Sequence, residues 1–107
     1  MTFYHANDKH FKPGDLIEPG HPANFADEPS GYVFFTDNLE AAEFWESFLG
    51  GESRAEKIGY FPTVYRYAVD PSGIYYPDDH PVNRELSGVW MSKRPLRVIS
   101  LLETFPG

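Results

Sequence analysis

The chain contains no cysteine among its 107 residues. It therefore forms no disulfide, offers no thiolate to a metal ion and has no cysteine nucleophile. This absence is typical of a protein in the reducing cytoplasm, so the sequence predicts a cytoplasmic location. There is no run of about 18 apolar residues from which to build a membrane-spanning helix, and the first residues lack the basic start and apolar core of a secretory signal. A membrane partner is therefore not expected.

Basic residues are scarce as well. Nine Lys and Arg stand against 16 Asp and Glu, and the formal net charge is −7. An acidic surface repels phosphate backbones, which argues against nucleic acid as a partner. The chain also lacks G-x-G-x-x-G, P-loop, G-x-S-x-G and H-E-x-x-H motifs. A nucleotide bound here is therefore not held by a Rossmann phosphate turn.

Aromatic residues, by contrast, make up 17% of the chain and supply enough bulky apolar surface for one core. The length predicts a single domain, residues 1–107. Ten Pro and nine Gly divide it into short elements. Runs of β-branched and aromatic residues predict strands at 2–5, 31–36, 63–69, 74–76, 89–91 and 96–102, with an apolar step at 16–17 and turns at 12–15 and 70–73.

One helix is predicted over about 37–49. It begins with a capping-box-like pair, Asp37 and a Glu three residues later, and Gly50-Gly51 ends it. Apolar residues recur at helical spacing, at Ala41, Phe44, Trp45 and Phe48. We therefore expect Phe44, Trp45 and Phe48 to pack against the sheet. The ambiguous segment 52–61 has room for another helical turn. Many strands with one main helix predict an α+β fold with a mixed or antiparallel sheet.

Two polar features are candidates for chemistry. His5 closes the first strand, either as a half-buried side chain bonded to the backbone or as a residue that orients a ligand at a strand end. Asp78 and Asp79 lie in a loop between two prolines, either as a solvated turn or with one carboxylate stabilising a developing positive charge in a cleft. A metal site built on these acids and His10, His21 and His80 has little support, because no pair has ligand spacing.

The aromatic residues leave alternatives open. Phe34 and Phe35 are neighbours in one strand and point to opposite faces, so one of them is free to line a pocket. In the run 63–69, Tyr65, Tyr67 and Val69 are expected on one face of a strand. The tyrosines form either an amphipathic seam or a wall on which a flat ring would stack. They are Tyr65, Tyr67, Tyr75 and Tyr76.

Several short motifs occur in one order along nearly the whole chain. They are F-Y-H at 3–5, K-P-G-D-L-I at 12–17, A-N-F at 23–25, V-F-F-T at 33–36 with L-E-A-A at 39–42, V-Y through V-D-P-S-G at 64–73, D-D before P-V-N at 78–83, and S-K-R-P-L-R-V-I at 92–99. Taken together, this series resembles the rifamycin ADP-ribosyltransferases.

The resemblance implies a split β-sandwich with one main helix and few additional helical turns. It also implies a mono-ADP-ribosyltransferase, a glycosyltransferase that uses NAD as co-substrate and releases nicotinamide. The acceptor implied is either a small molecule such as a rifamycin or a macromolecule. Modification of a rifamycin would be an antibiotic-resistance reaction. A protein partner is left open.

The same resemblance implies site residues. The strand-end His falls on His5, flanked by Tyr4 and Ala6, and is expected to donate to a ribose hydroxyl. The family's aromatic falls on Phe34, which would stack on nicotinamide. The catalytic acid falls on Asp79, with Asp78 as the alternative, and would stabilise an oxocarbenium-like ribose. Ala6 and Phe34 replace the family's usual Gly and Tyr. This leaves a non-catalytic relative, which binds a nucleotide or a protein, as the alternative function.

Overall fold

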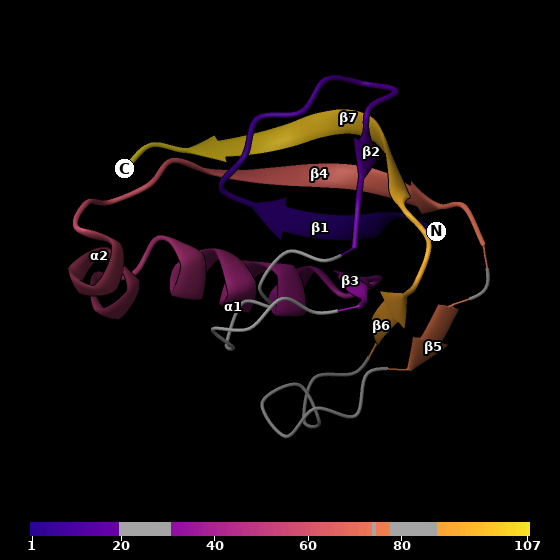
Figure 1. The fold of residues 1–107 in the computed structure, drawn as a ribbon, viewed down its shortest axis with the longest axis horizontal. Coiled ribbons are helices and arrows are strands. Elements are labelled where there is room, and N and C mark those ends of the chain that lie inside the picture. The colour runs from indigo at the N-terminus through magenta and orange to yellow at the C-terminus, as the bar shows by residue number, and fades with distance from the viewer. Residues whose placement is uncertain (20–30, 74, 78–87) are drawn as a thin grey trace.

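The computed structural model describes residues 1–19, 31–73, 75–77 and 88–107. Strands dominate this part of the chain, with two helices between the third and fourth strands (Figure 1). In chain order the elements are β1 (Phe3–Asn7), β2 (Leu16–Ile17), β3 (Val33–Thr36), α1 (Leu39–Leu49), α2 (Glu52–Ile58), β4 (Val64–Pro71), β5 (Tyr75–Pro77), β6 (Val89–Ser92) and β7 (Leu96–Phe105). The predicted α+β class is confirmed.

The strands form one curled sheet in the order β2-β7-β4-β1-β3-β6-β5, and each neighbouring pair is antiparallel. β1 and β4 pair over the whole length of β1. Between β1 and β3, however, the register contains a single pair, Tyr4 with Thr36. The sheet therefore consists of two well-paired parts, β2-β7-β4-β1 and β3-β6-β5, that meet at one narrow junction.

Each face of the sheet carries its own core. The inner cluster, on the face opposite α1, comprises Ile17, Val33, Phe35, Tyr67, Val69, Leu96 and Val98, with Phe3, Phe11, Tyr65 and Trp90 packed against it. The helix-side cluster comprises Ala6, Ala41, Trp45, Leu49, Val64 and Val89, with Phe34 and Phe105 packed against it. Strand alternation produces this division, because successive side chains point to opposite faces. It confirms the faces predicted for Tyr65, Tyr67 and Val69.

The predicted face of the main helix was right for Ala41 and Trp45 and wrong for Phe44 and Phe48. α1 buries Ala41, Ala42, Trp45, Glu46 and Leu49. Trp45 is in the core as expected, but Phe44 and Phe48 remain 42% and 39% exposed. The buried stripe is thus shifted by about one residue, or ~100° around the helix. The predicted cap was also one residue early, because Asn38 rather than Asp37 accepts from the Glu40 N–H at 3.0 Å.

An ion pair accounts for the unexpected burial of a glutamate on α1. The Nε and Nη2 atoms of Arg66, on β4, donate to the two carboxylate oxygens of Glu46 at 2.6 and 2.7 Å. The Arg66 guanidinium also lies over the Phe105 ring, 5.4 Å from its centroid. The hydrogen bond with Glu46 raises the pKa of Arg66. This pair joins α1 to the sheet, and apolar periodicity alone does not reveal it.

Two further segments differ in detail from expectation. The ambiguous segment 52–61 contains a complete second helix, α2, which ends at Gly59 with φ +89°. The first two residues of the turn predicted at 70–73 belong instead to β4, which continues through Pro71. The turn at 12–15 is confirmed, with Gly14 at φ +91° and the Asp15 N–H donating to the Lys12 carbonyl at 3.0 Å. Neither helix has the length and apolar character needed to cross a lipid bilayer.

Candidate functional site

The candidate site is built on β1, at the junction between the two parts of the sheet. The prediction that His5 closes this strand was wrong, because β1 continues through Asn7 and His5 is its central residue. His5 is 8% exposed and pairs across the strands with Tyr67 of β4. Tyr67 belongs to the inner cluster, and cross-strand neighbours share a face, so the His5 side chain lies on the inner face of the sheet. A buried histidine needs partners for its ring nitrogens.

The first partner crosses the junction. His5 Nδ1 donates to the backbone carbonyl of Phe34 on β3 at 2.6 Å. This side-chain bond adds a second link between β1 and β3, beside the single register pair of Tyr4 and Thr36. The structure therefore shows the bond from ring to backbone that was one of the two expectations for His5. A ligand that reaches this ring would do so at the junction of the two sheet parts.

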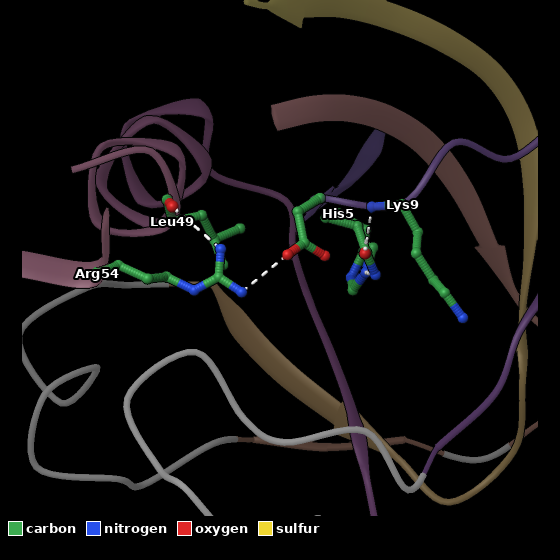
Figure 2. A network of polar contacts seen from close by, with 6 residues as sticks. His5, Lys9, Leu49 and Arg54 are labelled. Atoms are coloured by element: carbon green, nitrogen blue, oxygen red, sulfur yellow. Dashed lines mark hydrogen bonds and ion pairs between the residues drawn. The ribbon is translucent and has the colours of Figure 1, made fainter. Parts of the chain in front are cut away.

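The second partner comes from two residues along β1. Asn7 Nδ2 donates to His5 Nε2 at 3.1 Å. Asn7 Oδ1 in turn accepts from the backbone N–H of Lys9 at 2.9 Å (Figure 2). Both ring nitrogens of His5 thus take part in hydrogen bonds. The sequence analysis missed Asn7, and the signal available was a second polar residue on the same strand face as His5.

The segment after β1 is anchored by both helices and by β4. Arg54 of α2 donates to Asp8 at 2.8 Å and to the Leu49 carbonyl of α1 at 3.1 Å (Figure 2). From β4, the Tyr67 hydroxyl donates to the Lys9 carbonyl at 2.7 Å and accepts from the Phe11 N–H at 2.8 Å. Burial raises the pKa of Tyr67. These bonds hold the backbone that orients Asn7.

The other predicted cofactor-binding side chains lie on the opposite face of the sheet. Ala6 is buried in the helix-side cluster, and Phe34 packs against that cluster. Tyr4 shares the face of Ala6 by strand alternation. The structure therefore brings His5 and Phe34 together through the Phe34 carbonyl, whereas their side chains point to different faces. Asp78 and Asp79 lie outside the described residues.

Of the tyrosine set, Tyr67 is fully buried, whereas Tyr75 remains 37% exposed. The Tyr65 and Tyr67 rings stack at 6.1 Å, and Tyr75 makes edge contacts with Phe3, Phe35 and Trp90 at 5.2–5.9 Å. This packing favours the seam over the stacking wall. The Tyr76 side chain is outside the described part. No group of three or more metal-binding side chains occurs within the described ranges, and of the weakly supported metal set only His10 falls inside them.

Comparison with known protein families gives a match over nearly the whole chain. A family model described as rifampin ADP-ribosyl transferase matches residues 3–105. This range contains every strand and both helices of the structure. A search of the curated proteins found no match. The resemblance read from the collinear motifs is confirmed by the match, and the chain belongs to the rifampin ADP-ribosyl transferase family.

Proposed function

We propose that this protein is an NAD-dependent mono-ADP-ribosyltransferase, a single domain over residues 1–107 with a split β-sandwich fold. The observation that carries the proposal is the family match over residues 3–105. The curled sheet supports it, because its two well-paired parts meet at one register pair, as halves of a split sandwich would. We place the protein in the cytoplasm, where NAD is available.

The reaction transfers ADP-ribose from NAD to an acceptor. The bond between the ribose anomeric carbon and the nicotinamide nitrogen breaks, and its electron pair leaves with nicotinamide. An acceptor hydroxyl or amine then bonds to the same carbon and loses its proton. The ribose passes through an oxocarbenium-like state, so a carboxylate placed beside it lowers the barrier.

The residues proposed to carry out this reaction come from the family resemblance. His5 is the proposed NAD-binding side chain. Tyr4, Ala6 and Phe34 adjoin it through their backbone, since their side chains lie on the opposite face, and Asp79, with Asp78 as the alternative, supplies the carboxylate. The position of His5 at the β1–β3 junction supports its inclusion, because both parts of the sheet meet there. Ala6 directs its methyl group into the helix-side cluster, so this methyl adds no bulk on the inner face.

The acceptor class we favour is a rifamycin, since the matching family is named for rifampin. Modification of such a compound would confer antibiotic resistance on the host. A macromolecular acceptor, including a protein side chain, would use the same chemistry and is distinguished by experiment. The net charge of −7 disfavours nucleic acid in this role.

The decisive experiment measures nicotinamide release by chromatography, with NAD and rifampin together and with each alone. We expect release that depends on rifampin, together with a rifampin product heavier by one ADP-ribose. Asp79→Asn should slow release by about 100-fold, the effect of one preorganised charge, while NAD affinity changes little. Asp78→Asn is the matched control and should slow release much less.

Each other outcome has a defined meaning. A larger effect from Asp78→Asn would move the catalytic role to that residue. Release without a rifampin product would replace rifampin by another acceptor or by water. NAD binding without any nicotinamide release, under all acceptor conditions, would contradict the enzyme proposal and leave a non-catalytic nucleotide-binding relative.

A further inference from the structure

We propose that Asn7 is a positioning residue that holds His5 as the neutral Nδ1–H tautomer, so that His5 meets NAD through Nε2 as a hydrogen-bond acceptor. The role in NAD binding rests on the proposed function. The tautomer itself rests only on the geometry of the free protein. The inference reverses the expected direction of the bond, because His5 was expected to donate to a ribose hydroxyl.

The argument starts from a group whose role is unambiguous. The backbone N–H of Lys9 is a donor only, and it lies 2.9 Å from the Asn7 side chain. The Asn7 atom that faces it must therefore be the amide oxygen. This leaves the amide nitrogen, a donor only, facing His5 Nε2 at 3.1 Å. Nε2 must then accept, and it carries no proton.

The other side of the ring leads to the same assignment. The Phe34 carbonyl oxygen is an acceptor only, and it lies 2.6 Å from His5 Nδ1. Nδ1 must therefore carry the proton. The two partners, one on each ring nitrogen, specify one neutral tautomer. An imidazolium would place an Nε2–H against the Asn7 amide hydrogens and is disfavoured.

Charged groups near His5, among the described residues, influence whether its ring takes up a second proton. On the chain itself they are Asp8 and Lys9, and from α2 comes Arg54, which pairs with Asp8 at 2.8 Å. From β4 comes Tyr67, whose hydroxyl is engaged with the Lys9 carbonyl and the Phe11 N–H. Asp8 is thus paired with a cation, and Tyr67 carries its proton at pH 7, which lies well below the ordinary tyrosine pKa of 10.0 that burial raises further.

A direct consequence concerns the ligand. The one ring atom of His5 that a ligand group can share or take over from Asn7 is an acceptor. The ligand must therefore offer a donor, and a ribose hydroxyl can donate as well as accept. A carbonyl or phosphate oxygen at the same place would face a lone pair and be rejected. His5 thus selects for a hydroxyl at this point.

The experiment is a measurement of the His5 tautomer by nitrogen-15 NMR, whose two ring signals separate a protonated from an unprotonated nitrogen. In the free parent protein at pH 7, we expect Nδ1 protonated and Nε2 unprotonated. Asn7→Asp presents only acceptors to Nε2, so both nitrogens should become protonated. Asn7→Ala removes the donor to Nε2 but leaves the Phe34 carbonyl on Nδ1, so Nδ1 should stay protonated while the Nε2 signal moves. Each variant's folding is confirmed from the remaining amide signals.

The matched control is Asn38→Asp. It makes the same change of charge at the cap of α1, where Asp serves as well as Asn, and it should leave the His5 signals as in the parent. An Nε2–H tautomer in the parent would overturn the proposal. Unchanged His5 signals in both Asn7 variants would also overturn it, since Asn7 would then have no influence on the protonation of the His5 ring.

Adding NAD to the parent protein tests the proposed role of His5 Nε2 as an acceptor for NAD. We expect the Nε2 signal to move while Nε2 stays unprotonated, because a hydroxyl now donates to it. Appearance of an Nε2–H on binding would overturn the acceptor role. If NAD binds nowhere, as shown by an unchanged spectrum, the proposed function and the ligand role fail together. The tautomer assignment and its dependence on Asn7 are judged from the spectra without NAD, so the two failures are distinguishable.

Discussion

Replacement of Glu46 by Gln tests the ion pair that joins α1 to the sheet. The pair is well shielded, with 6% of the Glu46 side chain and 16% of the Arg66 side chain exposed. Each of its two charge-assisted hydrogen bonds contributes about 1.5–3 kcal/mol. Gln retains one acceptor oxygen but turns an amide N–H₂ toward an Arg donor. About one bond is therefore lost and the other weakened, so we expect a loss of about 2–4 kcal/mol.

The assay is urea unfolding followed by circular dichroism at pH 7. A loss of this size should lower the urea midpoint by about 1–2 M for a domain of this length. The control is Asp70→Asn, which breaks the exposed pair of Asp70 and Arg97, whose side chains are 52% and 58% exposed, and should cost less than about 1 kcal/mol. Equal losses from the two variants would refute the reasoning.

A second variant distinguishes the loss of the attraction between Glu46 and Arg66 from the cost of leaving the Arg66 charge buried without a partner. Glu46→Leu alone leaves the Arg66 guanidinium without its carboxylate in a mostly buried place, and we expect it to cost about 3–5 kcal/mol. Adding Arg66→Met removes that charge and keeps an apolar stem beside Phe105. The double variant should therefore recover most of the loss. If it is less stable than Glu46→Leu alone, burial of an uncompensated charge is not the cause.

Three further predictions use other parts of the structure. Trp45→Ala should cost about 3–5 kcal/mol in the same urea assay, whereas Phe44→Ala, on the exposed side of α1, should cost clearly less; a larger loss at Phe44 would restore the helix face expected from the sequence. Because burial raises the pKa of Tyr67, the folded protein keeps this proton where the unfolded chain has lost it. The free energy of unfolding should thus be unaffected below the ordinary tyrosine pKa of 10.0 and fall above it, and Tyr67→Phe should flatten that alkaline decline; an unchanged slope would contradict it. Millimolar NAD should raise the melting temperature of the parent, and His5→Ala should remove most of this shift, whereas His10→Ala should retain it; a shift that survives His5→Ala would place the nucleotide elsewhere.

The sequence alone was sufficient for most of the strands, for the turn at 12–15 and for the family. Period-two alternation in 63–69 predicted both the strand and its faces, since adjacent side chains of any strand point to opposite sides. The turn at 12–15 followed from Pro13-Gly14, because Gly14 takes a positive φ that other residues avoid. The collinear motifs indicated the family that the match over 3–105 then confirmed.

The tertiary structure decided the features that depend on residues distant in the chain. The face of α1 was misjudged because Glu46 counts as polar in any helical pattern, and only Arg66, 20 positions away on β4, makes its burial favourable. The roles of the two His5 nitrogens were likewise undetermined, because the Phe34 carbonyl arrives from another strand and the Lys9 N–H orients Asn7. Such hydrogen bonds and ion pairs join groups with no regular spacing, so a single sequence does not disclose them, and the fold assigns the partners.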